Sequence, residues 1–484
     1  RVTWAPHPEG LVFATSATAV AGFPGIEASL RQQALYDFLF MHMVPAPRTV
    51  YAGISKLPLA TALQFDDGRV ILERYWSPTY NYARASEFGN LKRSLREGLA
   101  AGVTASGVDK ATGTFLSGGL DSSSVTGTLA GIQDGPARTF TVGFGEADYD
   151  ELRFARTANK HFSCQPLEHQ MRPADIVEAF PRIAAAYDEP FGNSSAAPTY
   201  FCAKLAAENG ISHLLAGDGG DELFGGNERY IRHGVFEAYK HIPAWLRRSV
   251  IEPLVSPFSP EGQFMPLAKL RSYVDQARIP LPDRFESWNF MYREGGEQML
   301  DPEFAASIDR QAPLKRMREV WESAPSDNRL ERMLWYDWQF TLADNDLRKV
   351  GTMCELAGVR VSYPMLHPDV INLSLRVPPE MKIKGMELRH FFKKAMADFL
   401  PAEIIAKKKQ GFGLPFGLWL KSDAALAEMI YSYLADLKKR RIIAAHFIDH
   451  LIAQHREGHA SYFGYAIWDL AMLEAWLAAH TGRY

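Results

Sequence analysis

The chain is 484 residues long, with a formal net charge of -3 and 23% charged side chains. This length allows two or three domains with substantial cores. The small net charge predicts neither a nucleic-acid partner nor an anionic membrane partner. No apolar run of the sequence is long enough to span a membrane and no signal peptide is expected, so the predicted location is the cytoplasm.

The cysteines indicate a reducing compartment. Cys164, Cys202 and Cys354 are far apart, odd in number, and form no C-x-x-C pair. This usage supports neither a disulfide framework nor a zinc site, and it predicts buried free thiols.

Residues 1–80 precede a predicted domain boundary near Tyr80. Within them, Leu11 to Ala14 predicts a strand, and Ile26 to Phe40 has helical periodicity. The chain begins with Arg1 rather than methionine, which predicts that the natural N-terminus lies further upstream.

The most informative stretch is F-L-S-G-G-L-D-S-S-S-V, which begins at Phe115. A buried strand over Thr114 to Leu116 and a tight Gly118-Gly119 turn are expected, followed by a helix that Ser122 or Ser123 caps. Backbone N–H groups gathered at such a turn attract phosphate. No G-x-x-x-x-G-K-[ST] sequence occurs, so the loop differs from that of the common nucleotide hydrolases. An ordinary glycine-rich turn is the alternative.

Strands and helices alternate after this loop. Thr139 to Phe144 and His213 to Gly217 predict strands, and Asp150 to Lys160 predicts a helix. This alternation predicts a parallel, doubly wound α/β sheet that binds its ligand at the carboxyl ends of the strands. Residues 228–340 and 418–484 are predicted to be helical, and the tryptophans of the first of these segments are expected in the core.

A second polar turn, A-G-D-G-G-D-E, follows the later strand. It carries Asp218, Asp221 and Glu222 among glycines. Unpaired buried carboxylates are too costly for a core strand, so these acids form either a surface turn or part of a site at the sheet edge that carries Asp121. Carboxylates from two strand ends can hold Mg²⁺ against triphosphate oxygens. Asp121 and Asp221 are therefore the predicted metal ligands.

The loop S-G-G-L-D-S-S and the turn G-D-G-G-D-E-L-F-G-G resemble motifs of the asparagine synthetase family, whose members cleave ATP to AMP and pyrophosphate. The resemblance covers nearly the whole chain. Residues 1–80 resemble the C-terminal portion of a glutaminase-like, Ntn-type α/β domain without its catalytic cysteine, and residues 81–484 resemble the synthetase domain. The resemblance implies an ATP-pyrophosphatase α/β domain with a helical C-terminal part.

The resemblance also implies roles for individual residues. Asp218 matches the position that handles the proton of the acceptor amine. Lys409, within K-K-Q-G-F-G-L-P, matches a lysine that would stabilise negative charge on pyrophosphate and the acyl-adenylate. Arg389 stands where the family has a lysine and could contact phosphate. ATP contacts are implied for Leu116, Ser117, Gly118, Gly119, Asp121, Ser122, Val142, Gly217 and Arg389.

Other segments match the family in part. Asp188-Glu189 and Ser194-Ser195 resemble a pattern found near the phosphates. The run from Leu342 to Pro364 aligns without gaps with a family segment near the acceptor acid, with matches at Lys349 and Val350. Charged residues of the family are replaced in and just after this run, at Gly351, Thr352, Arg360, Ser362 and His367. The reversal from glutamate to Arg360 puts aspartate as the substrate in doubt, and drift at a structural salt bridge is the alternative.

Together these features predict an ATP-dependent carbon–nitrogen ligase that uses ATP and Mg²⁺. A small-molecule or peptide carboxylate would form an acyl-adenylate, and ammonia or an amine would displace AMP. The alternatives are intramolecular amide closure, as in β-lactam synthetase or lasso-peptide cyclases, and a catalytically inactive nucleotide-binding protein. Because no N-terminal cysteine is present, this polypeptide is not expected to hydrolyse glutamine. The oligomeric state, including a homodimer, stays open.

Overall fold

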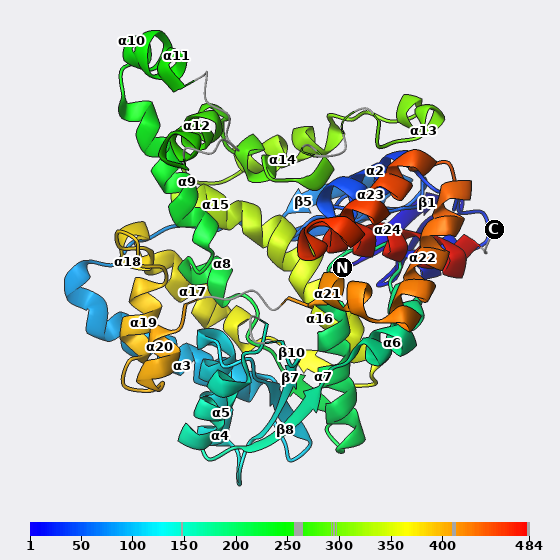
Figure 1. The fold of residues 1–484 in the computed structure, drawn as a ribbon. Helices are drawn as coiled ribbons and strands as arrows, with labels where there is room; N and C mark the ends of the chain where they lie inside the picture. The colour runs from blue at the N-terminus through cyan, green and yellow to red at the C-terminus, as the bar shows by residue number, and fades with distance from the viewer. Residues whose placement is uncertain are drawn as a thin grey trace.

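A parallel five-stranded sheet lies at the centre of the larger part of the chain (Figure 1). The computed structural model describes residues 1–146, 149–255, 265–291, 293, 296, 298–408 and 413–481. The strands are β6 (Thr112–Phe115), β7 (Arg138–Gly143), β8 (Gln165–Gln170), β9 (His213–Leu215) and β10 (Arg360–Ser362). Their order in the sheet is β10-β9-β6-β7-β8. The order changes direction between β6 and β9, which is where ligands bind in doubly wound folds.

Helices cover both faces of this sheet. On one face, α4 (Leu120–Ile132) contacts β6 and α5 (Leu152–His161) contacts β7 and β8, with α3 (Phe88–Ala105) packed against α4. On the other face, α7 (Ala196–Glu208) contacts β7 and β8, and α16 (Leu347–Leu356) contacts β10. The predicted α/β fold class is confirmed, because strand and helix alternate and all neighbouring strands of this sheet are parallel.

Residues 1–80 form antiparallel structure beside this unit. Their strands are β1 (Thr3–His7), β2 (Gly10–Ala14), β3 (Ser55–Lys56), β4 (Thr61–Asp66) and β5 (Arg69–Arg74), in a β2-β1-β3 sheet and a β4-β5 hairpin. Two helices, α1 (Ala17–Ala21) and α2 (Gln32–Met41), accompany them.

The remaining chain is helical, and the helical character predicted for residues 228–340 and 418–484 is confirmed over their described parts. Its helices are α6 (Pro173–Ala186), α8 (Gly220–Phe224), α9 (Glu228–Ala238), α10 (Ala244–Leu246), α11 (Glu252–Val255), α12 (Met265–Arg278), α13 (Pro302–Ala306), α14 (Ala312–Glu322), α15 (Arg329–Asp337), α17 (Pro368–Arg376), α18 (Pro379–Lys382), α19 (His390–Met396), α20 (Ala402–Ala406), α21 (Phe416–Ser422), α22 (Ala424–Lys439), α23 (Ala445–Glu457) and α24 (Ala460–Thr481). A π-helical segment, Trp338–Asp346, joins α15 to α16. None of the helices in the described ranges is long and apolar enough to cross a membrane.

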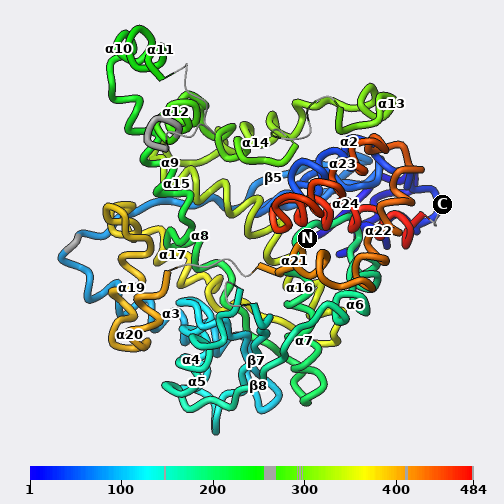
Figure 2. Tube along the Cα trace, in the orientation of Figure 1, coloured from blue at the N-terminus to red at the C-terminus, as the bar shows by residue number. Residues whose placement is uncertain are grey.

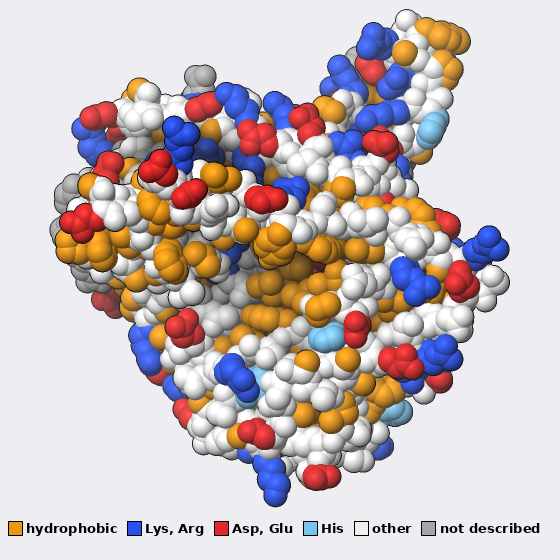
Figure 3. Space-filling view, turned by 180° about the vertical axis from the view of Figure 1, so that it is seen from behind, with side chains coloured by type: hydrophobic (Ala, Val, Ile, Leu, Met, Phe, Trp, Pro, Cys, Tyr) orange, Lys and Arg blue, Asp and Glu red, His pale blue; other side chains and the backbone are white. Residues whose placement is uncertain are grey.

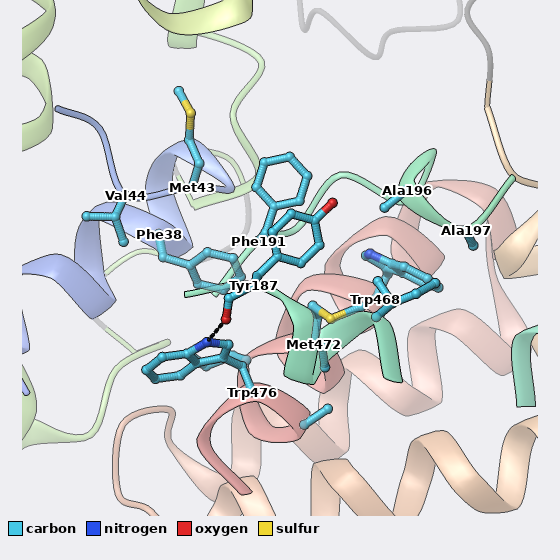
Figure 4. Close-up of a cluster of buried hydrophobic side chains, with 14 of the residues drawn as sticks. Phe38, Met43, Val44, Tyr187, Phe191, Ala196, Ala197, Trp468, Met472 and Trp476 are labelled. Atoms are coloured by element: carbon cyan, nitrogen blue, oxygen red, sulfur yellow. Dashed lines mark hydrogen bonds between the residues drawn. The ribbon is translucent and has the colours of Figure 1, made fainter. Parts of the chain in front are cut away.

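One hydrophobic core joins the N-terminal residues to the C-terminal helices (Figure 4). Phe38 of α2 and the following Val44 lie beside Tyr187 and Phe191, with Trp476 of α24 closing the cluster. The Trp476 indole also donates to the carbonyl oxygen of Tyr187 at 2.9 Å. Residues 1–80 are therefore built into the same core as α24.

Three local expectations are wrong. Helix α4 begins at Leu120 with Gly119 as its N-cap residue, so Ser122 and Ser123 lie inside the first turn and do not cap it. The helix expected from Ile26 begins only at Gln32, because Leu30 instead forms an antiparallel bridge with Tyr51.

The third concerns the tryptophans. Trp245 and Trp288 are exposed rather than in the core. The expectation of free thiols holds, with Cys202 and Cys354 buried and Cys164 partly exposed.

Candidate active site

The chain can turn tightly after β6 because glycine has no side chain, and the turn leaves no room for one. Gly118 has a φ of 69°, and a Cβ at this position would lie 2.4 Å from the backbone nitrogen of Ala155. The turn places Ser117 and Ser122 together, with their hydroxyl oxygens 3.1 Å apart. The first turn of α4 therefore opens directly at the carboxyl end of β6, as a phosphate-binding loop requires.

The second turn, after β9, packs tightly against the first. A Cβ on Gly217 would lie 2.7 Å from the backbone nitrogen of Ser122. Gly219 has a φ of 102°, which places α8 so that its first residues face Asp121. A Cβ on Gly220 would lie 2.0 Å from Oδ1 of Asp121. Glycines thus allow the two loops to meet at the point where the strand order changes direction.

This close approach predicts the effect of adding one methyl group. Gly217→Ala is expected to lower the free energy of unfolding by about 1–3 kcal/mol, because the two backbones must separate. Gly131→Ala is the matched control: its Cβ would meet nothing within 4 Å, and alanine in a helix is favoured over glycine by up to about 1 kcal/mol. Urea titration of both variants measures the difference, and equal stabilities would contradict the packing described here.

A cavity of about 1420 Å³ opens where the loops meet. The predicted site residues that line it are Leu116, Ser117, Gly119, Asp121, Ser122, Val142, Gly217, Asp218, Asp221 and Arg389. Gly118 does not line the cavity and acts through the turn. Lys409 lies outside the described residues, so its role stays a prediction.

Arg389 joins the two loops at the floor of this cavity. Its Nη1 donates to Oδ2 of Asp121 at 2.5 Å and to Oδ1 of Asp221 at 2.9 Å, and its Nη2 donates to the other oxygen of Asp121. The guanidinium carbon lies 4.6 Å from the ring centre of Phe392. Arg389 has a left-handed backbone, with a φ of 58°, at the start of α19. Such strain in a residue other than glycine is found mostly at functional sites.

A second group of charges lies beside Asp218. Lys349 donates to Asp346 at 2.8 Å, and both line the cavity with Asp218 and Glu222. Burial and then the nearby carboxylate of Asp346 raise the pKa of Glu222 to about 8. Burial likewise raises the pKa of Asp218 to about 6, against the opposing effect of Lys349. The motif assigned no role to Glu222, and Asp346 was missed, although its spacing of three from Lys349 on a helix is a signal for an ion pair.

These raised pKa values predict how stability changes with pH. A carboxyl whose pKa is higher in the folded state stabilises the fold below its unfolded pKa, and this stabilisation is lost as pH rises through the folded value. For Glu222 the window runs from its ordinary value of 4.5 to about 8. Glutamine cannot ionise, so Glu222→Gln should remove this loss. The free energy of unfolding of wild type should therefore fall, relative to that of the variant, by roughly a few kcal/mol across the window. Urea unfolding of both proteins across this range measures the difference, and parallel curves would contradict it.

Basic side chains also line the cavity. Lys384, Lys393, Lys407 and Lys408 line the cavity. Lys407 is held in place, because its Nζ lies 2.6 Å from Glu151 and 3.5 Å from the carbonyl oxygen of Ser117. A cavity with glycine-loop N–H groups and several cations is suited to a polyphosphate.

The pair Asp188-Glu189 is not part of this lining. Ser194 and Ser195 line the cavity, but neither acid does. Asp188 instead accepts hydrogen bonds from the N-terminal part of the chain, at 2.7 Å from Ser16. Glu189 likewise accepts from the backbone N–H of Val50 at 2.9 Å. Both acids therefore hold the N-terminal part of the chain in place, and their expected place near the phosphates stays a prediction.

The positions after residue 350 at which the chain differs from the family pattern also lie away from the cavity. Arg360 and Ser362 belong to β10 and contact His213 of β9, at 3.2 Å and 2.9 Å. Burial and then the nearby Arg360 lower the pKa of His213 to about 4, so the imidazole is neutral at pH 7. None of the five replaced positions lines the cavity, whereas Lys349 and Val350 do. Arg360 and Ser362 thus have structural partners, and the doubt about aspartate as the substrate stays a prediction.

Two family models match the chain. Residues 94–478, well over half of the chain, match the model described as asparagine synthase. The chain belongs to the asparagine synthase family. Residues 3–76 match the model described as a glutamine amidotransferase domain. The family resemblance seen in the sequence is confirmed.

Curated relatives of the asparagine synthase family share low identity with the chain. The glutamine-hydrolyzing asparagine synthetase 1 of Bacillus subtilis is 22% identical over 431 residues, covering 89% of this chain and 66% of the relative. A putative glutamine-hydrolyzing asparagine synthetase of Mycobacterium bovis is 23% identical over 465 residues, which cover 94% of this chain and 68% of the relative. The putative glutamine-hydrolyzing asparagine synthetase 2 of Methanocaldococcus jannaschii is 30% identical over 227 residues, which cover 45% of this chain and 43% of the relative. The chain thus spans about two thirds of the length of the first two.

Proposed function

We propose that this chain is an ATP-dependent carbon–nitrogen ligase that activates a carboxylate as an acyl-adenylate and transfers ammonia or an amine to it. The observation that carries the proposal is the meeting of Asp121, Asp221 and Arg389 beside a glycine loop, at the switch point of a doubly wound sheet. This arrangement is suited to holding a triphosphate with its α-phosphate next to a second substrate.

The donor set supports magnesium as the metal. The carboxylates of Asp121 and Asp221 converge on one cation, the guanidinium of Arg389. Carboxylate oxygens are ligands of Mg²⁺, which usually binds one or two of them together with substrate phosphates. Among the described residues, no three His, Cys, Asp or Glu side chains are grouped to hold a metal alone. Mg²⁺ would therefore bind with ATP, neutralising phosphate charge.

The first step would be attack of a carboxylate oxygen on the α-phosphorus, which breaks the bond to pyrophosphate. Leu116 and Val142 would contact adenosine, while Ser117, Gly119 and Ser122 would receive phosphate oxygens at the start of α4. Arg389, which lies between the two loops, would contact phosphate oxygens. Positive groups placed where charge develops stabilise such a transition state.

The second step would be attack of the amine on the acyl carbon, which breaks the carbon–oxygen bond and releases AMP. The attacking nitrogen must lose a proton, and Asp218 is the proposed acceptor. Its pKa of about 6 lies near the range in which a carboxylate accepts a proton effectively. Lys349, beside Asp346, would help keep Asp218 ionised.

Residues 1–80 would support the synthetase part of the chain through the hydrophobic core that they share with it. Residues 3–76 match an amidotransferase model, yet Cys164, Cys202 and Cys354 all lie outside them. A domain boundary near Tyr80 is proposed here, with ammonia or a substrate amine as the nitrogen source for this polypeptide.

ATP–pyrophosphate exchange tests the proposal directly. Labelled pyrophosphate is expected to enter ATP only in the presence of Mg²⁺ and a suitable carboxylic acid, because adenylation is reversible before the amine attacks. A panel of amino acids, dicarboxylic acids and amine-bearing acids would identify the substrate class. ATP cleavage to ADP, with no exchange for any acid, would contradict the proposal.

A further inference from the structure

A helical arm projects from the body of the molecule (Figures 1 and 2). We define the projecting arm as residues 239–255 and 269–278, which include α10, α11 and most of α12. Its interior is small, with Tyr239, Val255, Val274 and Ala277 as the buried side chains. So thin a projection cannot bury its own apolar surface.

The base of the arm is fixed to the body. The guanidinium of Arg284 is fully buried and lies 2.7 Å from Glu237 of α9. Its Nε also donates to the carbonyl oxygen of Ile279 at 2.8 Å. The arm is therefore fixed at its base, and its tip projects from the body (Figure 1).

Large apolar side chains are exposed on the arm. Trp245 is 67% exposed and Leu254 is 66% exposed, with Val250 and Leu270 exposed beside them in the same arm. Figure 3 shows hydrophobic side chains at the end of the projection and lysines and arginines along it. Exposed apolar patches on a soluble protein usually mark an interaction site.

The arm is also basic, although the chain as a whole is not. Its two ranges contain six Lys or Arg and two Asp or Glu, a formal charge of +4, whereas the whole chain carries -3. Arg248 and Lys269 are both exposed, and each cation near an anionic surface strengthens binding. The sequence prediction of no anionic membrane partner rested on the net charge, which conceals this local excess.

We propose that the projecting arm docks on an anionic phospholipid surface. Tryptophan and leucine side chains enter the boundary between headgroups and acyl chains, and Arg248 and Lys269 contact lipid phosphates. The shape favours a membrane over an acidic polypeptide, since a peptide ligand lies in a groove and this arm is convex (Figure 3). Docking through the arm would leave the ATP cavity open to substrate.

Vesicle sedimentation of the full chain tests this proposal. Binding is expected to vesicles of phosphatidylcholine with phosphatidylglycerol, but not to phosphatidylcholine alone. Arg248→Gln with Lys269→Gln should weaken binding by roughly 30-fold at low salt, at about fivefold for each cation near the surface. Trp245→Ala with Leu254→Ala should weaken it by about tenfold or more at any salt concentration.

Matched controls distinguish binding through the arm from nonspecific adsorption to vesicles. Phe13, on β2, is 68% exposed, so Phe13→Ala removes a similar aromatic surface elsewhere and should bind vesicles as wild type does. All arm variants should keep ATP–pyrophosphate exchange unchanged. Three outcomes would overturn the proposal: no binding to anionic vesicles, equal loss in Phe13→Ala, or arm variants that instead abolish a dimer or the binding of poly-glutamate.

Discussion

Asp221→Asn is expected to reduce the formation of AMP and pyrophosphate by about 10³-fold or more. The substitution keeps the size of the side chain but removes one of the two charges that converge at Arg389. Loss of a carboxylate that holds a metal against phosphate oxygens removes several kcal/mol of charge stabilisation, roughly. Asp121→Asn should have an effect of similar size, because its carboxylate shares the same cation.

Glu228→Gln is the matched control for these variants. Glu228 also lines the cavity and is exposed at its edge, and the same loss of charge there should leave turnover close to that of wild type. Circular dichroism would confirm that each variant is folded. Turnover of Asp221→Asn within about threefold of wild type would contradict the assigned role.

The second large effect is expected at the contact between residues 1–80 and the rest of the chain. Glu189 is 1% exposed and lies 2.6 Å from Lys56 and 2.9 Å from Arg348. Burial lowers the pKa of Lys56, and Glu189 is the main group that opposes this shift. Glu189→Ala leaves a buried ammonium without its counter-charge, and should lower the free energy of unfolding by about 3–5 kcal/mol.

Glu168→Ala is the control for this prediction, because Glu168 pairs with the exposed Arg156 on the surface. An exposed pair contributes at most about 1 kcal/mol, so this variant should be nearly as stable as wild type. Urea unfolding of both variants measures the difference. The double variant Glu189→Ala with Lys56→Met should recover part of the loss, since the Lys56 ammonium is then no longer buried without a counter-charge, while the second partner, Arg348, is partly exposed. Equal, small losses in Glu189→Ala and Glu168→Ala would show that the contact is not buried in solution.

The loops and strands of the site could be predicted because their signals are local. Gly118, Asp121 and Asp221 lie in short motifs that follow apolar strands, and parallel strand ends meet at one edge. Arg389 was expected to contact phosphate, but its ion pair with Asp121 spans 268 positions in sequence. No local pattern encodes such a contact, because it depends on how α19 packs beside the two loops.

Other features depend on packing that the motifs do not reveal. Asp188 and Glu189 match a motif near phosphates, yet their partners are Ser16 and Lys56, both in the N-terminal part of the chain. Trp245 has the helical context of a core residue but lies on a projection too thin to bury it. A place in a motif or in a helical segment therefore does not by itself fix which side chains a residue contacts.

Transfer of ¹⁸O from the substrate tests the central claim most directly. An acid that supports exchange would be labelled in both carboxyl oxygens and converted to its amide with ATP and ammonia. If the carboxylate attacks the α-phosphorus, one labelled oxygen must leave with AMP, and mass spectrometry should find a single ¹⁸O in each AMP formed. AMP without label, or label in phosphate released together with ADP, would contradict activation by adenylation.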